Sequence, residues 1–412
     1  MTHLEIKNNK SYLGGVLIED LAAKYGTPLY IYNAEVIEEK YKKLNKAFKH
    51  KINVKYAMKA LSNISILKFL KKLGSGLDTV SIQEVLLGLE AGFAPDQIIY
   101  TPNCVSLDEI SEAVDKGVII NIDNIPLLEQ FGHKYGNTVP VCIRVNPHIM
   151  AGGNYEISTG HIDSKFGISF HQMRHVQRVI QQTKLNVIGL HMHTGSDILD
   201  VGVFLRGSEI LFELAEDFPD LHFIDLGSGF KVSYWPDDNT TNIEDLGEQL
   251  SNRFTAFCKA YGRDLELFFE PGKYLVSEAG LFVAKVNVVK QTTATVFVGL
   301  DTGMNHLLRP KLYNAHHEIT NISYPQGIER IYSVVGYICE SDTMGLDRKL
   351  NEVNEGDLIA FHNAGAYGMS MASNYNSRFR PAEVMLYKGK NYLIRKRETM
   401  NDITRNMVAV EL

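Results

Sequence analysis

The chain contains few cysteines and has no excess of positive charge. Its four cysteines, Cys104, Cys142, Cys258 and Cys339, lie far apart among 412 residues, and none forms a CxxC pair. This spacing predicts neither a disulfide framework nor structural zinc, and it favours a reducing compartment such as the cytoplasm. The 42 basic and 48 acidic residues are mixed along the chain, which argues against nucleic acid as a partner.

Long apolar segments are also absent. No run approaches the roughly 20 apolar residues that a membrane-spanning helix needs. The first ten residues are polar and charged, so we expect neither a membrane anchor nor an export signal. Because 45% of the residues are hydrophobic, the chain can bury a large core, and its length favours two domains.

Between residues 50 and 270, short apolar runs alternate with longer amphipathic stretches, which is the pattern of repeated βα units. The intervening stretches include Ser81–Ala91, Leu107–Lys116 and Phe204–Glu216, which are predicted as helices. Eight parallel strands close a barrel at about 250 residues, whereas an open doubly wound sheet usually stops near six. We therefore predict an α/β fold with a (β/α)8 TIM-type barrel. The eight predicted strands are Val54–Met58, Leu77–Val80, Ile98–Thr101, Val118–Ile122, Val141–Val145, Val187–His191, Phe223–Leu226 and Leu267–Phe269.

After Gly280 the pattern changes to short strands separated by turns, with no long helical period between them. Such a pattern predicts a second, mostly antiparallel β-domain. We assign residues 27–280 to the barrel, and residues 1–26 plus 281–412 to the β-domain. The predicted strands of the second domain are Leu281–Val289, Thr295–Gly299, Arg330–Val335, Asp357–Phe361 and Glu383–Tyr387.

Polar residues collect where the predicted barrel strands end, and chemistry in such barrels takes place at that face. Lys59 follows the first strand. A lysine in this position loses hydration in its charged form, which lowers its pKa and lets the amine attack an aldehyde. The alternative is a lysine that extends into solvent, and for the residue in isolation this alternative is the better one.

Two further strand ends carry notable residues. Gly227-Ser228-Gly229 follows the seventh strand, and its backbone N–H groups can approach an anion such as phosphate because glycine has no Cβ. Glycines that serve only the turn geometry explain the segment equally well. Glu270 ends the eighth strand, where its carboxylate would face the barrel mouth, unless it caps a turn or pairs with Lys273.

His191 and His193 are two residues apart at the end of the sixth strand. A pair at this spacing can bind a metal, but no third ligand lies near it in the sequence. We therefore predict no metal site.

With these residues in place, the chain resembles the diaminopimelate decarboxylases over nearly its whole length. They belong to the alanine-racemase-like enzymes that use pyridoxal 5′-phosphate. Tyr56–Ala60 resembles the lysine motif of the family, so the resemblance implies that Lys59 binds the cofactor covalently. It also implies that His193 stacks on the cofactor ring and that Glu270 keeps the pyridine nitrogen protonated, which makes the ring a better electron sink. The cofactor contacts implied are Lys59, Asp78, His193, Ser196, Gly227, Ser228, Gly229, Glu270, Gly272 and Tyr367.

The second domain contains the segments that indicate which substrate the family resemblance implies. Arg309–Tyr313 resembles the RPxLY segment of the family, whose Arg and Tyr hold a substrate carboxylate. Cys339-Glu340-Ser341 resembles the segment that is typical of the diaminopimelate enzymes, with Cys339 as proton donor and Glu340 at the distal amino end. The implied substrate contacts are Arg309, Tyr313, Glu340, Lys273 and Tyr367.

Two segments depart from the family pattern. Lys273 replaces the usual arginine, so a planar two-bond contact becomes a point charge, and its contact with phosphate or substrate is an open question. Ala151–Glu156 is unlike the usual loop before the segments Ile157–Gly160 and Ser164–Gly167, which resemble the substrate-side loop. Neither departure removes a residue that the cofactor chemistry requires.

The resemblance implies decarboxylation of meso-2,6-diaminopimelate to L-lysine and CO2, the last step of lysine synthesis, by a homodimer with shared active sites. The alternatives are a carboxynorspermidine or other basic amino-acid decarboxylase, a racemase, and a pyridoxal-phosphate-binding protein without turnover. Glu340 argues against the ornithine-type enzymes, which carry Asp there. Lys59 and Cys339 argue against a relative without turnover, because such relatives lose one or the other.

Overall fold

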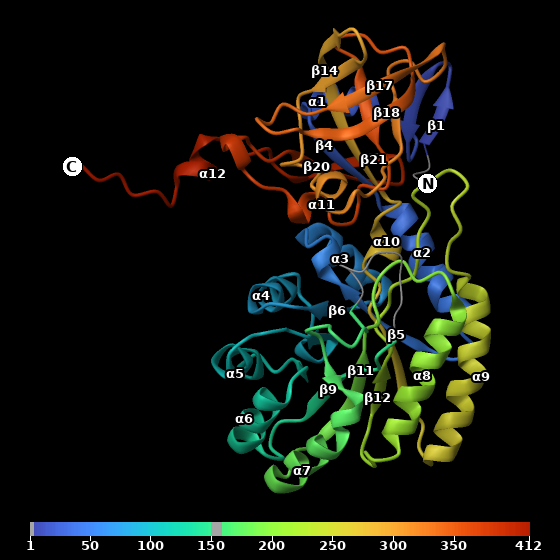
Figure 1. The fold of residues 1–412 in the computed structure, drawn as a ribbon, viewed down its shortest axis with the longest axis vertical. Coiled ribbons are helices and arrows are strands. Elements are labelled where there is room, and N and C mark those ends of the chain that lie inside the picture. The colour runs from blue at the N-terminus through green and yellow to red at the C-terminus, as the bar shows by residue number, and fades with distance from the viewer. Residues whose placement is uncertain (1–3, 150–158) are drawn as a thin grey trace. The chain divides into compact units, whose positions relative to one another are not determined.

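The computed structural model describes residues 4–149 and 159–412, and the chain divides into two compact units. The barrel unit comprises Glu39–Val232 and Asn239–Tyr274. The β unit comprises Met1–Glu38, Ser233–Asp238 and Leu275–Leu412. Both units are drawn in Figure 1.

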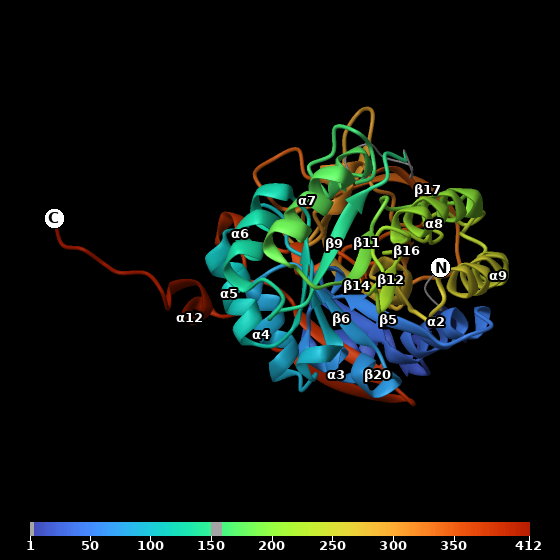
Figure 2. The ribbon, with the colours of Figure 1, turned by 90° about the horizontal axis from the view of Figure 1, so that it is seen from below.

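The barrel unit contains a closed ring of parallel strands. Pairing of β13 with β5 and of β8 with β9 closes the ring, which confirms the predicted barrel. Figure 2 shows helices outside these strands. All six residues of β9 are buried, as expected for a parallel strand that is covered on both faces. The eight strands are β5 (Ile52–Ala57), β6 (Gly76–Thr79), β7 (Ile98–Tyr100), β8 (Ile119–Ile122), β9 (Val141–Asn146), β11 (Val187–Met192), β12 (Phe223–Asp225) and β13 (Glu266–Phe269).

The helices of the barrel unit begin at polar residues. The side chains of Ser81, Ser106 and Asn124 each accept a hydrogen bond from a backbone N–H in the first turn, which satisfies a donor that the helix itself leaves unpaired. A further strand of two residues, β10 (Ile168–Ser169), pairs in parallel with β9. The helices are α2 (Ala34–Ala47, which begins in the β unit), α3 (Ile64–Leu73), α4 (Ile82–Glu90), α5 (Leu107–Asp115), α6 (Ile125–Tyr135), α7 (Met173–Thr183), α8 (Val201–Ala215), α9 (Ile243–Tyr261) and α10 (Lys273–Val276, which ends in the β unit).

The β unit contains a three-stranded sheet of β1, β2 and β3 and a nine-stranded, mostly antiparallel sheet with two parallel pairings, β15 with β17 and β20 with β4. A core of Leu29, Ile31, Leu281, Val283 and Val384 packs inside it. The strands are β1 (Leu4–Lys7), β2 (Lys10–Leu13), β3 (Val16–Leu17), β4 (Leu29–Asn33), β14 (Gly280–Gln291), β15 (Val296–Leu300), β16 (Ile319–Asn321), β17 (Glu329–Val335), β18 (Thr343–Asn351), β19 (Leu358–Phe361), β20 (Ala382–Tyr387) and β21 (Lys390–Arg395), with helices α1 (Ile18–Tyr25), α11 (Arg309–Tyr313) and α12 (Met400–Thr404).

The boundary between the units differs from the predicted one at residue 27. The strand β4 pairs with β14 and β20, so the residues up to Glu38 belong to the β unit. The short segment Ser233–Asp238 also belongs there. Among the described residues, no helix is both long and apolar enough to cross a membrane.

Candidate active site

Lys59 and Asp78 form an ion pair where two adjacent strands end. After β5 the chain makes one 3-10 turn, η1 (Met58–Ala60), and Asp78 lies on β6 opposite Ala57. Lys59 Nζ lies 2.8 Å from Asp78 Oδ2, and the Asp78 side chain is only 1% exposed. Burial, and then the charge of Glu270, raises the pKa of Asp78 although Lys59 opposes the shift. A buried carboxylate needs a compensating cation, and Lys59 supplies it.

Glu84 caps the start of α4 beside this pair. Its backbone N–H donates to Ser81 Oγ at 3.2 Å, which caps the helix, and its Oε2 accepts the N–H of Val80, the residue before the cap, at 2.8 Å. Burial, and to a lesser degree the charge of Asp78, raises the pKa of Glu84 to about 7. Glu84 therefore changes its charge near neutral pH.

His191, Asp225 and Glu270 form a buried cluster inside the barrel. His191 on β11 is paired in register with Asp225 on β12, and Asp225 is paired with Phe268, two residues before Glu270. His191 Nε2 lies 2.9 Å from Glu270 Oε2. Burial raises the pKa of Glu270, but the charge and hydrogen bond of His191 and the charge of Lys59 outweigh it and lower the pKa to about 2. Glu270 is therefore ionised.

Asp225 is a site residue that the sequence did not single out. Burial, and then the charge of Glu270, raises its pKa well above the usual value, so it favours the protonated form beside the ionised Glu270. Ligand atoms of His191, Asp225 and Glu270 lie within 4.8 Å of one another, so the fold supplies partners for His191 that its sequence neighbours do not. The position of Asp225, two residues before the glycine turn, was the signal available.

The glycine turn lies against His193. Gly227 and Gly229 have φ angles of +62° and +114°, and a Cβ atom would lie 2.5 Å from Met192 O and 2.3 Å from Gly195 O respectively. Both positions therefore require glycine. The segment does not lead directly into a helix, since α9 begins only at Ile243.

Two of the three N–H groups in this turn already have protein acceptors. The Gly227 N–H donates to Asp225 Oδ1 at 2.8 Å, and the Ser228 N–H donates to His193 Nδ1 at 3.2 Å. His193 Nδ1 therefore carries no proton. Burial, then the charges of Lys59 and Arg144, lowers the pKa of His193 to about 3, so its ring is neutral.

Arg144 is a second residue that the sequence analysis missed. It lies on β9, is 6% exposed, and its guanidinium carbon lies 4.8 Å from the centroid of the Phe166 ring. Burial lowers its pKa, and the charges of Glu270, Asp123 and Asp78 oppose the shift. An arginine inside an apolar strand run is rarely buried without such carboxylates.

Lys273 follows Gly272 at the end of β13. It is buried, and its Nζ lies 2.7 Å from Asp197 Oδ2. Asp197 is the neighbour of Ser196 in the loop after β11. A Cβ at Gly272 would lie 3.1 Å from Ala57 O, so this turn packs tightly against the end of β5.

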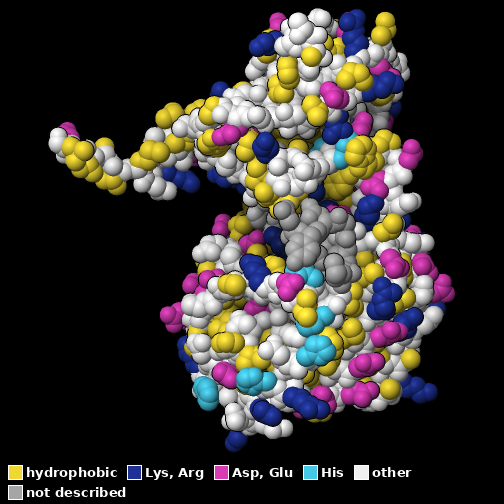
Figure 3. Space-filling view, viewed as in Figure 1, with side chains coloured by type: hydrophobic (Ala, Val, Ile, Leu, Met, Phe, Trp, Pro, Cys, Tyr) yellow, Lys and Arg dark blue, Asp and Glu magenta, His cyan; other side chains and the backbone are white. Residues whose placement is uncertain are grey.

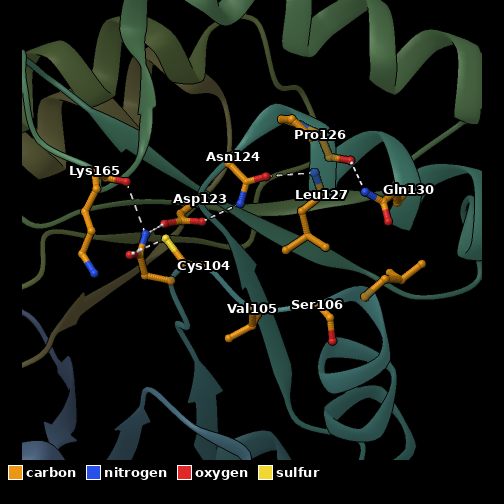
Figure 4. A pocket seen from close by; sticks show the side chains of 11 residues that line it. Cys104, Val105, Ser106, Asp123, Asn124, Pro126, Leu127, Gln130 and Lys165 are labelled. Atoms are coloured by element: carbon orange, nitrogen blue, oxygen red, sulfur yellow. Dashed lines mark hydrogen bonds between the residues drawn. The ribbon is translucent and has the colours of Figure 1, made fainter.

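A separate pocket of about 500 Å³ opens beyond β7 and β8. In Figure 4 the side chains of Asp123 and Lys165 lie on one side of it, and those of Leu127 and Gln130 on the other. Asn103 Nδ2 donates to Asp123 Oδ2 and to Lys165 O. Lys165, from the predicted substrate-side segment Ser164–Gly167, is among the residues that line this pocket.

The predicted site residues of the β unit differ in burial. Arg309 opens α11 and is 6% exposed, whereas Tyr313 ends that helix half-buried. Tyr367 is half-buried in the loop after β19 and has a φ angle of +57°. Cys339 and Glu340 are both exposed.

Cys339 and Glu340 are held by a neighbouring turn, η6 (Tyr375–Ser377). Asn376 Nδ2 donates to Cys339 Sγ at 3.1 Å, and Tyr375 Oη donates to Glu340 Oε1 at 2.8 Å. The hydrogen bond with Glu340 raises the pKa of Tyr375 to about 12. Of the substrate-side loop, Ala151–Glu156, Ile157 and Ser158 lie outside the described residues, while the Thr159 hydroxyl donates to His193 O at 2.6 Å.

Comparison with known proteins shows the family to which the chain is similar. Residues 34–277 match the family described as pyridoxal-dependent decarboxylase, pyridoxal binding domain. The chain is 37% identical to the diaminopimelate decarboxylase of Methanothermobacter thermautotrophicus, with 97% of this chain and 96% of that protein covered, and 33% identical to that of Aquifex aeolicus at the same coverage. A solved structure of the Methanocaldococcus jannaschii enzyme with L-lysine covers 98% of each chain, with a TM-score of 0.90 and 33% identity.

Proposed function

This chain belongs to the diaminopimelate decarboxylases, a family of pyridoxal-dependent decarboxylases, and we propose that it converts meso-2,6-diaminopimelate to L-lysine and CO2 with the residues described above. The observation that carries the proposal is the group at the barrel rim, where Lys59 is paired with Asp78 and the ionised Glu270 is held by His191. This reaction is the last step of lysine synthesis.

The barrel residues fit pyridoxal phosphate. Glu270 Oε1 and Asp78 Oδ1 are buried without a hydrogen-bond partner among the described residues, so a polar ligand would satisfy groups that otherwise cost free energy. Lys59 would bind the aldehyde and Glu270 the pyridine nitrogen. When bound, the cofactor supplies an electron sink for the pair released as the bond to the carboxylate breaks.

The phosphate would lie at the glycine turn. Because Gly227 and Ser228 direct their N–H groups to Asp225 and His193, Gly229 is the member of the turn whose N–H donates to no described residue. Ser196 and Gly272 are further proposed phosphate contacts, and Tyr367 is proposed as a contact that the second copy of the chain supplies. Lys273 is held by Asp197, so we assign it to positioning of the Ser196 loop, with substrate contact as the alternative.

The side chains of the protein would deliver the proton and orient the cofactor and the substrate. Asp78 would hold the Lys59 ammonium group at the rim whenever Lys59 is not bonded to the cofactor. The neutral His193 ring can lie against the cofactor ring without placing a cation beside the protonated pyridine. Cys339 would deliver the proton that replaces the lost carboxylate, while Glu340 holds the distal amine and Arg309 with Tyr313 holds the remaining carboxylate.

We infer a homodimer with shared active sites, and the exposure of two proposed active-site residues supports it. Cys339 and Glu340 lie on the surface of the β unit, and a proton donor works best where water is excluded. A second copy would exclude that water. The four cysteines are all free thiols, which supports a reducing compartment such as the cytoplasm as its location.

The cofactor assignment has a direct test. Purified protein with pyridoxal phosphate should be yellow, and borohydride should fix the cofactor to the peptide that contains Lys59. Lys59→Ala should abolish both this labelling and the release of CO2 from meso-diaminopimelate, whereas Lys68→Ala on α3 should change neither. Undiminished turnover by Lys59→Ala would falsify the assignment.

The substrate has a separate test. Rates should be compared for meso-diaminopimelate, ornithine, arginine and carboxynorspermidine at equal cofactor occupancy. We expect diaminopimelate to have the highest kcat/KM by a wide margin. A preference for any of the other three would overturn the substrate while leaving the cofactor assignment intact.

A further inference from the structure

Arg309 is a buried cation that lacks a carboxylate partner among the described residues. Its Nη1 donates to Tyr234 Oη at 2.9 Å and lies 3.3 Å from His317 Nε2. Its guanidinium carbon lies 4.8 Å from the centroid of the Tyr234 ring. Tyr234 belongs to the segment Ser233–Asp238, so all three residues lie in the β unit.

The hydrogen bonds of His317 fix which of its ring nitrogens carries the proton. His317 Nδ1 lies 2.8 Å from the backbone oxygen of His362, which can only accept, so Nδ1 is the donor. In a neutral ring Nε2 is then an acceptor, and it faces the Arg309 N–H. Burial, and then the charge of Arg309, lowers the pKa of His317 to about 3, so the ring is neutral across the physiological range.

These neutral partners orient the guanidinium without cancelling its charge. A buried charge that is hydrogen-bonded but not neutralised is costly in the free protein and favours an anionic ligand. A guanidinium also presents two parallel N–H groups to a carboxylate. With one nitrogen held by Tyr234 and His317, its remaining donors have a fixed direction.

Resting on the proposed function, we infer that His317 and Tyr234 are positioning residues that aim Arg309 at the substrate carboxylate that stays in the product. Of the two substrate carboxylates, the one that stays in the product is the better partner for Arg309. A guanidinium bound to the departing carboxylate would stabilise a negative charge that disappears on the way to CO2, which slows the reaction.

The test compares two probes that differ in one carboxylate. L-Lysine carries the retained carboxylate, and 1,5-diaminopentane lacks it. With holoenzyme, we expect His317→Ala to weaken L-lysine binding by about ten- to a hundredfold and to leave diaminopentane binding unchanged. KM for diaminopimelate should rise by a similar factor while kcat changes much less. His317→Gln, whose side-chain oxygen can replace Nε2 as acceptor, should recover most of the loss.

Tyr234→Phe provides a second variant in case His317→Ala does not fold. It keeps the ring beside the guanidinium but removes the acceptor, so we expect a smaller loss for L-lysine, about three- to tenfold. Tyr324→Phe is the matched control, because Tyr324 is 50% exposed in the same unit, and it should bind both probes as wild type does.

Equal weakening of both probes in either variant, or no change in L-lysine binding, would overturn the inference. Wild-type turnover of diaminopimelate separates this failure from failure of the proposed function. If wild type turns over the substrate and the probe ratio does not move, the positioning role alone is wrong. If wild type does not turn it over, the proposed function is wrong and this inference is wrong with it.

Discussion

The proposed reactive groups are buried at the barrel rim, but they are exposed in the loop that contains Cys339 and Glu340. At the rim, Asp78 and Glu270 are buried and bonded to Lys59 and His191. In the loop, both residues are exposed, and their hydrogen bonds are to exposed residues of the turn η6. Buried, fixed charges act strongly because no water screens them. The rim is therefore preorganised within one chain, whereas the loop lies open to solvent.

The largest expected effect is the recovery of activity when two inactive variants are combined in one dimer. If the loop of one copy completes the barrel site of another, Lys59→Ala and Cys339→Ala are defective in different chains of each site. Coexpressed in equal amounts, half of the dimers would be mixed and one of their two sites intact, which restores about a quarter of wild-type activity. Activity no higher than the sum of the separate variants would show that each chain builds its site alone.

The next prediction compares a buried and an exposed glutamate. Glu270→Gln keeps the size of the side chain but removes the charge, so kcat should fall by about a hundred- to a thousandfold with the cofactor still bound. Glu340→Gln should raise KM for diaminopimelate and alter kcat less, because its charge is expected to grip the distal amine. The measurement is steady-state kinetics with cofactor absorbance recorded for each variant. Equal losses of kcat in the two variants would show that the buried and the exposed glutamate do not differ in their roles.

Shortening the exposed glutamate should have a smaller effect on substrate choice. Glu340→Asp withdraws the carboxylate by one methylene, and one methylene changes discrimination by roughly tenfold or more. We expect kcat/KM for diaminopimelate to fall about tenfold, with a relative gain for other basic amino acids. The matching change Asp78→Glu at the rim should instead disturb Lys59 labelling by borohydride. An unchanged substrate ranking in Glu340→Asp would exclude Glu340 from specificity.

The sequence predicted the elements whose pattern is local. The barrel strands are continuous apolar runs because both of their faces are buried, and their polar ends therefore mark Lys59, Asp78 and Glu270. By contrast, β18 was not predicted, because its charged residues, such as Asp347 and Arg348, hide the strand pattern. The place of β4 in the β unit depends on pairing with β14 and β20, which are distant in sequence.

One physical reason explains why the sequence did not reveal the remaining site residues. Asp225 and Arg144 are polar residues within apolar strands, and their partners come from register with other strands. Tyr234 reaches Arg309 only because the segment around it belongs to the β unit. No local periodicity encodes such contacts, although a buried charge in a strand is itself a signal worth following.

The last prediction concerns the stability of the folded protein and how it depends on the buried acids at the rim. Glu84 has a pKa of about 7 in the folded protein against a usual value of 4.5, so the folded state holds an extra proton between these pH values. Stability therefore falls as pH rises through this window, by up to about 3 kcal/mol at full effect. Glu84→Gln removes this proton, so its unfolding free energy should fall less between pH 5 and pH 8 than that of wild type.

Urea unfolding at several pH values measures this difference, with an internal control at low pH. At pH 4, Glu84 is largely uncharged in both the folded and the unfolded chain, so wild type and Glu84→Gln should be similarly stable there. Other titrating groups affect both proteins alike. The difference between the two slopes of unfolding free energy against pH is therefore due to Glu84. Parallel pH profiles would mean that the Val80 N–H, which Glu84 Oε2 accepts, stabilises the carboxylate enough to offset its burial.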